Sequence, residues 1–269
     1  MLNFNNYLRT VNMQVKIING TPNPVDTMWI AARTCYSAEG PIEMFESKKL
    51  KVQCSNWALV ESVLKSGHTS IAEHVNLTFA IEGISRACSH QLVRHRHCTF
   101  SQQSQRYVEI KETLTDIQDY FYEINNNTVV SEDTIRSFKQ VLSKYFVGVD
   151  DDTYYNYGLA LKCYLQVIQE GWKPEDARSF LPNAAKTNLV MTCNLRELMH
   201  ICDLRLCNRA QDEIRQLVRL IKAEVQNNYD ERIASLLMPQ CDRLGFCPEG
   251  KRCCGKKKTL DSLLGGTCK

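Results

Sequence analysis

The sequence predicts an α+β fold, a single compact domain in which long helices pack on a central sheet that contains antiparallel strands. One observation is a stretch of strict alternation, typical of a half-buried strand, at Val75, Leu77, Phe79 and Ile81. A second is that apolar residues recur at helical spacing over longer stretches, the longest of which covers 193–226. A third is that the sequence contains no internal repeat or low-complexity tract. Helices are therefore expected to dominate, with a few strands among them.

The first third of the chain has clear element boundaries. The segment 15–18 alternates weakly and ends at an Asn-Gly pair, which predicts a strand followed by a turn. Two prolines within 22–24 then precede a helix that continues to residue 32. A second helix is predicted over 48–66, and Gly67 supplies its C-terminal stop.

The middle of the chain is more polar. Gly83 is expected to break the strand before it, and Ser85 is expected to cap the next helix. The segment 111–152 is acidic and polar, with loops at either end of a short helix from Ser131, so we expect a surface excursion rather than a second domain. A further helix is predicted over 153–169.

Composition narrows the class of protein. The chain has 269 residues, of which 43% are hydrophobic and 23% charged, and this is ordinary globular chemistry. The net charge of +3 is too small to indicate a nucleic-acid binder by bulk attraction. No apolar run approaches a membrane span, and the first residues do not resemble a signal peptide. We expect a soluble cytoplasmic protein with one domain over 13–238 and a tail rich in Cys and Lys over 239–269.

The thirteen cysteines are expected to be reduced, because their number is odd and no export signal is evident. Four occupy core-like positions, where cysteine acts as a small hydrophobe: Cys54, Cys88, Cys163 and Cys202. The tail concentrates five more: Cys241, Cys247, Cys253, Cys254 and Cys268. Their gaps of five residues and the adjacent pair do not match the close pairs of zinc sites, so no metal site is predicted.

The most informative segment is 83–108, which holds 26 residues without one Asp, Glu or Lys. Its cations are all arginine, accompanied by three histidines: Arg86, Arg94, Arg96, Arg106, His90, His95 and His97. A guanidinium engages a phosphate or a nucleobase edge with two bonds, whereas an ammonium is a point charge. A solvated basic face that touches RNA is the alternative, but neutral donors beside the cations favour a confined, phosphorylated small ligand.

These residues also carry a family resemblance. Arg94-His95-Arg96 followed by seven residues and Ser104 resembles the signature of flavin-dependent thymidylate synthases. Further blocks are similar to family elements in the same order, at 67–74, 178–182, 194–198, 204–206 and 209–214. The resemblance extends over about 15–238 and leaves out the excursion and the tail.

The resemblance implies the family's fold, its reaction and its assembly. Such enzymes transfer a methylene group from methylenetetrahydrofolate to C5 of dUMP, and FAD reduced by NADPH supplies the hydride. Members of the family are homotetramers whose active sites are shared between subunits, and neither nucleic acid nor membrane is a partner. By the motif match, the residues implied to bind FAD are Ser70, Arg94, His95, Arg96, Gln102, Asn194, Arg196 and His200. Those implied to bind dUMP are Gln91, Arg94, Gln102, Gln103, Ser104, Gln105, Arg106, Arg178 and Arg205.

Arg205 is the implied catalytic residue, since a guanidinium at the pyrimidine edge stabilises the charge that develops when C5 attacks. Without the resemblance, a structural salt bridge would be the better interpretation of Arg205. Position 102 is often Glu in relatives, and Gln keeps the hydrogen-bonding reach but not the charge.

Other interpretations remain to be weighed. Ser104 could be a nucleophile with His95 as its base, but the segment offers no carboxylate to orient that base. We therefore interpret the Ser104 side chain as a hydroxyl that binds phosphate. A nucleic-acid-binding module and a thiol- or metal-responsive protein built on the tail are the competing functions.

Overall fold

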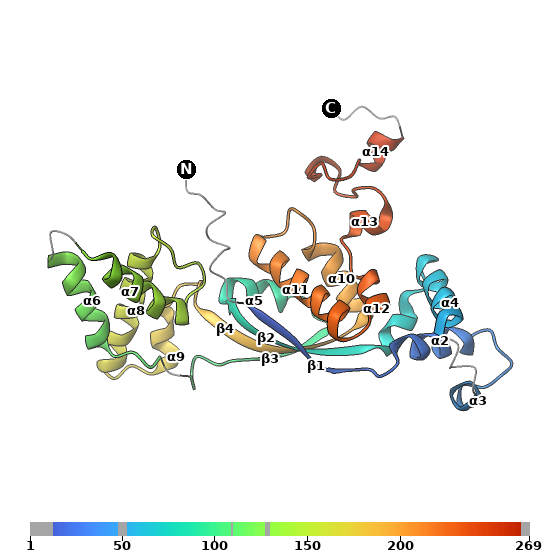
Figure 1. Ribbon diagram of the computed structural model, residues 1–269, viewed down its shortest axis with the longest axis horizontal. Coiled ribbons are helices and arrows are strands. Elements are labelled where there is room, and N and C mark those ends of the chain that lie inside the picture. Colours follow the sequence, from blue (N-terminus) through green and yellow to red (C-terminus); the bar gives the residue numbers. More distant parts are fainter. Residues whose placement is uncertain (1–12, 48–52, 109, 127–129, 265–269) are drawn as a thin grey trace. The chain divides into compact units, whose positions relative to one another are not determined.

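The computed structural model describes residues 13–47, 53–108, 110–126 and 130–264. Four strands form one sheet in the order β1-β2-β4-β3, with bounds Gln14–Gly20, Asn76–Ser85, Lys186–Asn194 and Cys98–Gln102 in that order (Figure 1). Neighbouring strands are antiparallel, as the end of β2 meets the start of β4 through Arg86 N donating to Ala185 O over 2.9 Å. The expectation of a mixed helical and antiparallel-sheet fold is confirmed.

Strand β2 follows the alternation in the sequence. Leu77, Phe79 and Ile81 are fully buried, whereas their polar neighbours are not. The prediction that Gly83 breaks the strand was wrong, because Gly83 adopts a φ of +74° within it and pairing continues to Ser85. The expected cap is confirmed, since Ser85 Oγ accepts a hydrogen bond from Cys88 N over 3.0 Å at the start of α5 (Arg86–Leu92).

Two compact units divide the chain, and each has its own helices. The first unit comprises 1–14, 81–92 and 101–189. Four of its helices lie together in the green-to-yellow part of Figure 1: α6 (Leu114–Asn126), α7 (Glu132–Tyr145), α8 (Tyr154–Gln169) and α9 (Pro174–Ala177). The excursion 111–152 therefore contains two full helices, and the sequence interpretation of one short helix from Ser131 missed α6. Phe121 and Phe138 meet edge to face at 5.6 Å in the core between α6, α7 and α8.

The second unit comprises 15–80, 93–100 and 190–269. Its early helices are α2 (Pro24–Thr34), α3 (Pro41–Glu46), α4 (Gln53–Lys65) and the 3-10 helix Thr69–His74. Helix α2 packs on α4, where the buried Asn56 donates to Asp26 Oδ1 over 3.0 Å. Its later helices are α10 (Leu195–Arg205), α11 (Asp212–Asn228), α12 (Glu231–Leu236), α13 (Gln240–Leu244) and α14 (Leu260–Leu263).

The segment 193–226 is not the single long helix that its periodicity predicts. The chain leaves the helix after Arg205, and α11 begins only when Gln211 Oε1 accepts a hydrogen bond from Ile214 N over 3.2 Å. Asn194 caps α10 in the same way, since its Oδ1 accepts from Glu197 N over 2.9 Å. Strands β3 and β4 were also not predicted.

The structure tests the expected burial of the cysteines. Cys88 and Cys202 are buried, as expected, but Cys163 is exposed on α8. Cys54 lies outside the residues whose side chains are described. Over the described ranges, none of the helices combines the length and the apolar character that crossing a membrane would require.

Candidate active site

A buried histidine is the centre of the site in the second unit. His95 follows α5 and precedes β3, and helix α10 brings three polar side chains to it. Its Nδ1 faces Glu197 Oε1 at 3.4 Å, and its Nε2 accepts a hydrogen bond from Arg205 Nε over 3.2 Å. The ring of His200 stands edge-on to it, with centroids 5.9 Å apart. The structure thus brings two of the other predicted site residues, Arg205 and His200, to His95, with Glu197 added.

His95 is neutral near pH 7. Burial, followed by the charges of Arg205 and His200, lowers its pKa to about 4. Arg205 Nε can only donate, so Nε2 of His95 must carry a lone pair and the proton must lie on Nδ1, toward Glu197. A carboxylate, a neutral imidazole and a guanidinium therefore follow one another in a defined order.

The same residues include a possible metal-ligand set. One ligand atom each from His95, Glu197 and His200 lie within 4.8 Å of one another. A dication there would meet the guanidinium of Arg205, which already binds one nitrogen of His95. The arrangement favours a hydrogen-bonded network over a metal centre.

The remaining predicted residues of this unit surround the network at the surface. Arg94 and Arg96 flank His95 in sequence and are exposed, and Ser70 is exposed in the 3-10 helix. Arg196 forms an ion pair with Glu73, also of the 3-10 helix. These guanidinium and hydroxyl groups are suited to binding phosphate oxygens.

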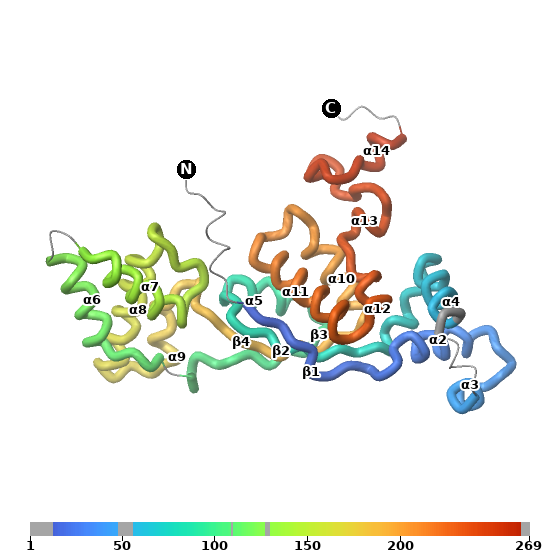
Figure 2. The backbone as a smooth tube through the Cα atoms, viewed as in Figure 1, coloured from blue at the N-terminus to red at the C-terminus, as the bar shows by residue number. Residues whose placement is uncertain are grey.

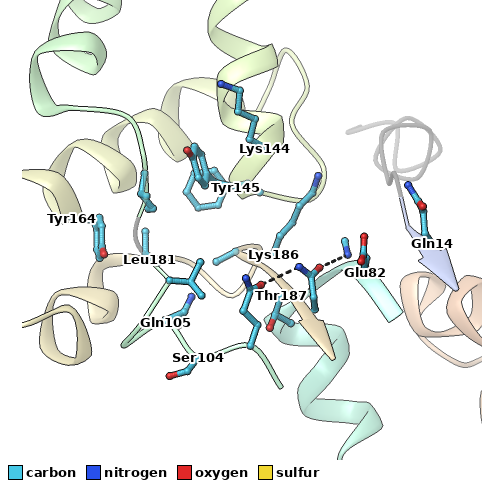
Figure 3. A pocket seen from close by; sticks show the side chains of 17 residues that line it. Gln14, Glu82, Ser104, Gln105, Lys144, Tyr145, Tyr164, Leu181, Lys186 and Thr187 are labelled. Carbon is cyan, nitrogen blue, oxygen red and sulfur yellow. Dashed lines mark hydrogen bonds between the residues drawn. The ribbon is translucent and has the colours of Figure 1, made fainter. Parts of the chain in front are cut away.

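A second group of predicted residues lies in the first unit, at the end of β3. Gln102 Nε2 donates to Ser89 Oγ over 3.0 Å and to Thr187 Oγ1 over 3.1 Å. Gln103 Oε1 accepts from Asn188 Nδ2 over 3.0 Å, and both residues line a cavity of about 390 Å³ (Figure 3). In Figure 3, Ser104 and Gln105 lie on one side of this cavity, and Lys144 and Tyr145 on the other.

Arginines gather near this second group. Glu175 of α9 accepts a hydrogen bond from Arg106 Nε at its carboxylate over 3.2 Å, and its backbone oxygen accepts from Arg178 Nε over 3.0 Å. Burial and the charge of Arg178 lower the pKa of Arg86. Several positive charges thus accumulate within one unit, as an anionic ligand requires. Gln91, also predicted here, is half-buried on α5.

The sequence interpretation did not identify the acidic residues that contact the segment 83–108, which contains no acid of its own. Glu197 reaches His95 and Glu175 reaches Arg106, both from distant parts of the chain. The signal available for Glu197 was its spacing, because Glu197 and His200 stand three residues apart on one helix. The nucleophile interpretation of Ser104 gains no support, since Nε2 of His95 is bonded to Arg205 and Ser104 Oγ accepts from Arg106 N over 3.2 Å.

Comparisons with known proteins agree on one family. The family model described as "Thymidylate synthase complementing protein" matches residues 16–229. The flavin-dependent thymidylate synthase of Geobacter sulfurreducens is 36% identical, covering 94% of this chain and 98% of that protein. That of Thermococcus onnurineus is 36% identical, covering 89% and 90%.

Solved structures share the fold. The crystal structure of thymidylate synthase X from Helicobacter pylori with FAD and dUMP has a TM-score of 0.65 and 24% identity, over 84% of this chain and 99% of that one. A UMP/dUMP methylase from Streptomyces cacaoi bound with 5-Br dUMP has a TM-score of 0.61 and 20% identity, over 84% and 94%. Together with the extended sequence similarity, these comparisons show that the chain belongs to the family of thymidylate synthase complementing proteins, which includes the flavin-dependent thymidylate synthases.

Proposed function

We propose that this chain is a flavin-dependent thymidylate synthase, which methylates dUMP to dTMP with methylenetetrahydrofolate as the carbon donor. The observation that carries the proposal is the similarity, over nearly the whole chain, to relatives that bear this name. The Arg94-His95-Arg96 motif and Ser104 lie within the matched region.

The residues present fit FAD, whose pyrophosphate needs several directed donors. Exposed Arg94 and Arg96 offer forked donors on either side of the buried, neutral His95. When bound and reduced by NADPH, the flavin supplies the hydride that completes the methyl group. The residues proposed to hold it are Ser70, Arg94, His95, Arg96, Gln102, Asn194, Arg196 and His200.

The residues proposed to hold dUMP combine neutral amides with guanidinium groups. Gln103, Ser104 and Gln105 line the cavity of about 390 Å³. The positive charge near Arg86 and Arg178 favours a phosphate. The full set is Gln91, Arg94, Gln102, Gln103, Ser104, Gln105, Arg106, Arg178 and Arg205.

Arg205 is proposed as the catalytic residue. Loss of the N3 proton to solvent would leave negative charge on N3 and its flanking oxygens and make C5 nucleophilic. C5 would then bond to the methylene carbon of the folate as the bond from that carbon to a folate nitrogen breaks, and C5 would later lose its own proton. A guanidinium held at that edge stabilises the developing charge. His95 fixes the orientation of Arg205 by accepting its Nε–H, and Glu197 in turn faces the other nitrogen of His95.

The proposal extends to assembly and location. We propose a cytoplasmic homotetramer with shared active sites, whose small-molecule partners are dUMP, the folate and NADPH, without nucleic acid or membrane. The exposed aromatic side chains of Tyr36, Phe45 and Tyr107 would leave water if neighbouring subunits covered them, which would favour assembly. The modest net charge of +3 supports small-molecule rather than nucleic-acid partners.

Spectroscopy and turnover test the proposal. The purified protein is expected to show a flavin absorbance spectrum and to oxidise NADPH in the presence of dUMP. It is expected to form dTMP when methylenetetrahydrofolate is added. Absence of dTMP from reactions that contain FAD, NADPH, dUMP and the folate would contradict the proposal.

A charge-conserving variant tests the binding motif. Arg94→Lys is expected to weaken flavin or dUMP binding at least tenfold, because lysine keeps the charge but lacks the fork. Arg136→Lys is the matched control, since Arg136 is exposed on α7 and pairs with Asp133, three residues earlier on the same helix. Equal affinities in the wild type and Arg94→Lys would remove Arg94 from the site.

A further inference from the structure

Five cysteines gather in the C-terminal part of the second unit, and we call them the thiol cluster: Cys207, Cys241, Cys247, Cys253 and Cys254. Cys207 follows α10, Cys241 lies in α13, and the others lie in the irregular red segment of Figure 2 that leads to α14. Four of them line one cavity of about 410 Å³: Cys207, Cys241, Cys247 and Cys254. The folded chain thus gathers thiols that its sequence spaces far apart.

Two backbone turns present sulfur atoms as hydrogen-bond acceptors. Gly255 N donates to Cys253 Sγ over 3.2 Å, and Gly255 has a φ of +84° that closes the turn. At Cys247, the sulfur likewise accepts a hydrogen bond from the backbone of Glu249. In both turns the donor stands two residues after the cysteine. Hydrogen bonds from amides to sulfur stabilise the thiolate, which is the form that binds metals.

The thiols also lie close to one another. The side chains of Cys247 and Cys253 are hydrogen-bonded to each other, and Cys241 lies near enough to Cys247 to interact with it electrostatically. The side chain of Cys241 interacts in the same way with Cys207 and Cys254. Thiolates gathered in one place are ligands that zinc-class dications prefer.

The surroundings carry positive charge that suits an anionic metal–thiolate centre. Lys256, Lys257 and Arg252 line the same cavity. Lys256 Nζ forms an ion pair with Asp242 Oδ2 over 2.7 Å. A dication bound by four thiolates has a net charge of about −2, which nearby cations offset.

We propose that the thiol cluster binds one zinc-class divalent cation through Cys207, Cys241, Cys247 and Cys253. Binding releases the four thiol protons to solvent and changes no oxidation state. Cys254 lines the cavity and Cys253 does not, but Cys254 is exposed whereas the side chain of Cys253 is hydrogen-bonded to that of Cys247, so Cys253 is placed in the ligand set and Cys254 outside it. The spacing of these cysteines in sequence argued against a metal because close pairs are absent, but here each ligand comes from its own turn or helix.

Within the described part of the chain, the group whose ligand atoms already lie within 4.8 Å of one another is His95, Glu197 and His200. The thiol cluster is wider, and its turns must close on the ion, since zinc–sulfur bonds are about 2.3 Å long. The ion would tie the tail to the end of α10, because Cys207 stands two residues after Arg205. Arg243 of α13 already forms an ion pair with Asp203 of α10.

Metal analysis of the full chain tests the proposal. Protein expressed with zinc and purified without chelator is expected to hold about one zinc ion per chain by elemental mass spectrometry. Cys241→Ser, Cys247→Ser and Cys253→Ser are each expected to lose at least four fifths of it. Cys254→Ser and the exposed Cys163→Ser are the matched controls and are expected to keep it.

Cobalt substitution of the wild type is a second measurement that does not depend on whether variants fold. Co²⁺ added to the metal-free protein is expected to give the intense thiolate charge-transfer and visible bands of a tetrahedral site, and zinc is expected to abolish them. The proposal is overturned if the wild type takes up no stoichiometric zinc or cobalt. It is also overturned by a Cys247–Cys253 disulfide in place of metal, or if Cys254→Ser loses zinc while Cys253→Ser keeps it.

Discussion

Arg205 donates its Nε–H to Nε2 of His95 over 3.2 Å, and this bond fixes the protonation state of the histidine. A protonated ring would place an N–H against another donor, so the bond requires neutral His95 with its proton on Nδ1. Glu197 faces that proton at 3.4 Å. Nε of Arg205 is therefore bonded to a neutral imidazole ring and not to a carboxylate.

The stability of the protein should depend on the titration of His95. The pKa of His95 is about 4 in the folded protein, whereas an ordinary histidine, as in the unfolded chain, has a pKa of 6.5. As the pH falls, the unfolded chain therefore binds a proton at His95 before the folded protein does. The stability from neutral His95 is therefore present above pH 6.5 and is lost as the pH falls toward 4. From pH 7.5 to pH 4.5 the wild type should lose about 2.5 kcal/mol more than His95→Gln.

Urea unfolding at the two pH values measures this difference. Glutamine cannot gain a proton in this range, which makes His95→Gln the reference for all other titrating groups. Parallel losses of unfolding free energy in the two proteins would show that His95 titrates normally in the folded state.

The substitution Arg205→Ala should affect the chemical rate more than binding. A group that acts on developing charge contributes about 3–4 kcal/mol to the transition state, which predicts a fall in kcat of about 10²–10³-fold. The dissociation constant of dUMP should rise less than about tenfold. Steady-state kinetics and equilibrium titration with dUMP give the two numbers, and equal losses in both would indicate a purely binding role.

Gln102 should tolerate glutamate but not an apolar side chain. Its Nε2 donates to the hydroxyls of Ser89 and Thr187. The Thr187 hydroxyl can turn to donate to a carboxylate instead, whereas the Ser89 hydroxyl already donates to Arg86 O over 3.0 Å. Gln102→Glu should therefore keep the unfolding free energy within about 1 kcal/mol of wild type, whereas Gln102→Met leaves two buried hydroxyls without this partner and should cost about 1–3 kcal/mol. Similar melting curves for the two variants would contradict the role of these bonds.

Much of the fold could be predicted where the signal is local. The alternation around Phe79 gave β2, and Ser131 correctly marked the start of α7, because its Oγ accepts from Thr134 N over 3.0 Å. Helix α6 was missed because acids and amides alternate with its apolar residues, so the segment was interpreted as polar. The long helix over 193–226 was wrong because periodicity cannot show that Gln211 starts a new helix.

In the candidate site, too, the features with a local sequence signal could be predicted and the long-range contacts could not. The arginines and histidines of 83–108 stand out in composition, so their concentration could be predicted. Their partners could not, because Glu197 and Glu175 lie far away in sequence and only the fold brings them to His95 and Arg106. The thiol cluster likewise depends on Cys207, which the fold adds to the cysteines of the tail.

A glycine on α8 tests the packing of the helices in the first unit. A Cβ on Gly158 would lie 2.5 Å from Phe138 Cζ and 3.1 Å from Phe121 Cζ, within a close-packed core. Gly158→Ala gains about 1 kcal/mol of helix propensity but overpacks these rings, so a net loss of about 1–3 kcal/mol in unfolding free energy is expected. Gly40→Ala is the matched control, since Gly40 has a φ of −73° and its Cβ would meet nothing within 4 Å. Urea unfolding of the wild type and both variants measures the difference. If Gly158→Ala is as stable as Gly40→Ala, the rings of Phe121 and Phe138 do not pack against α8 as described.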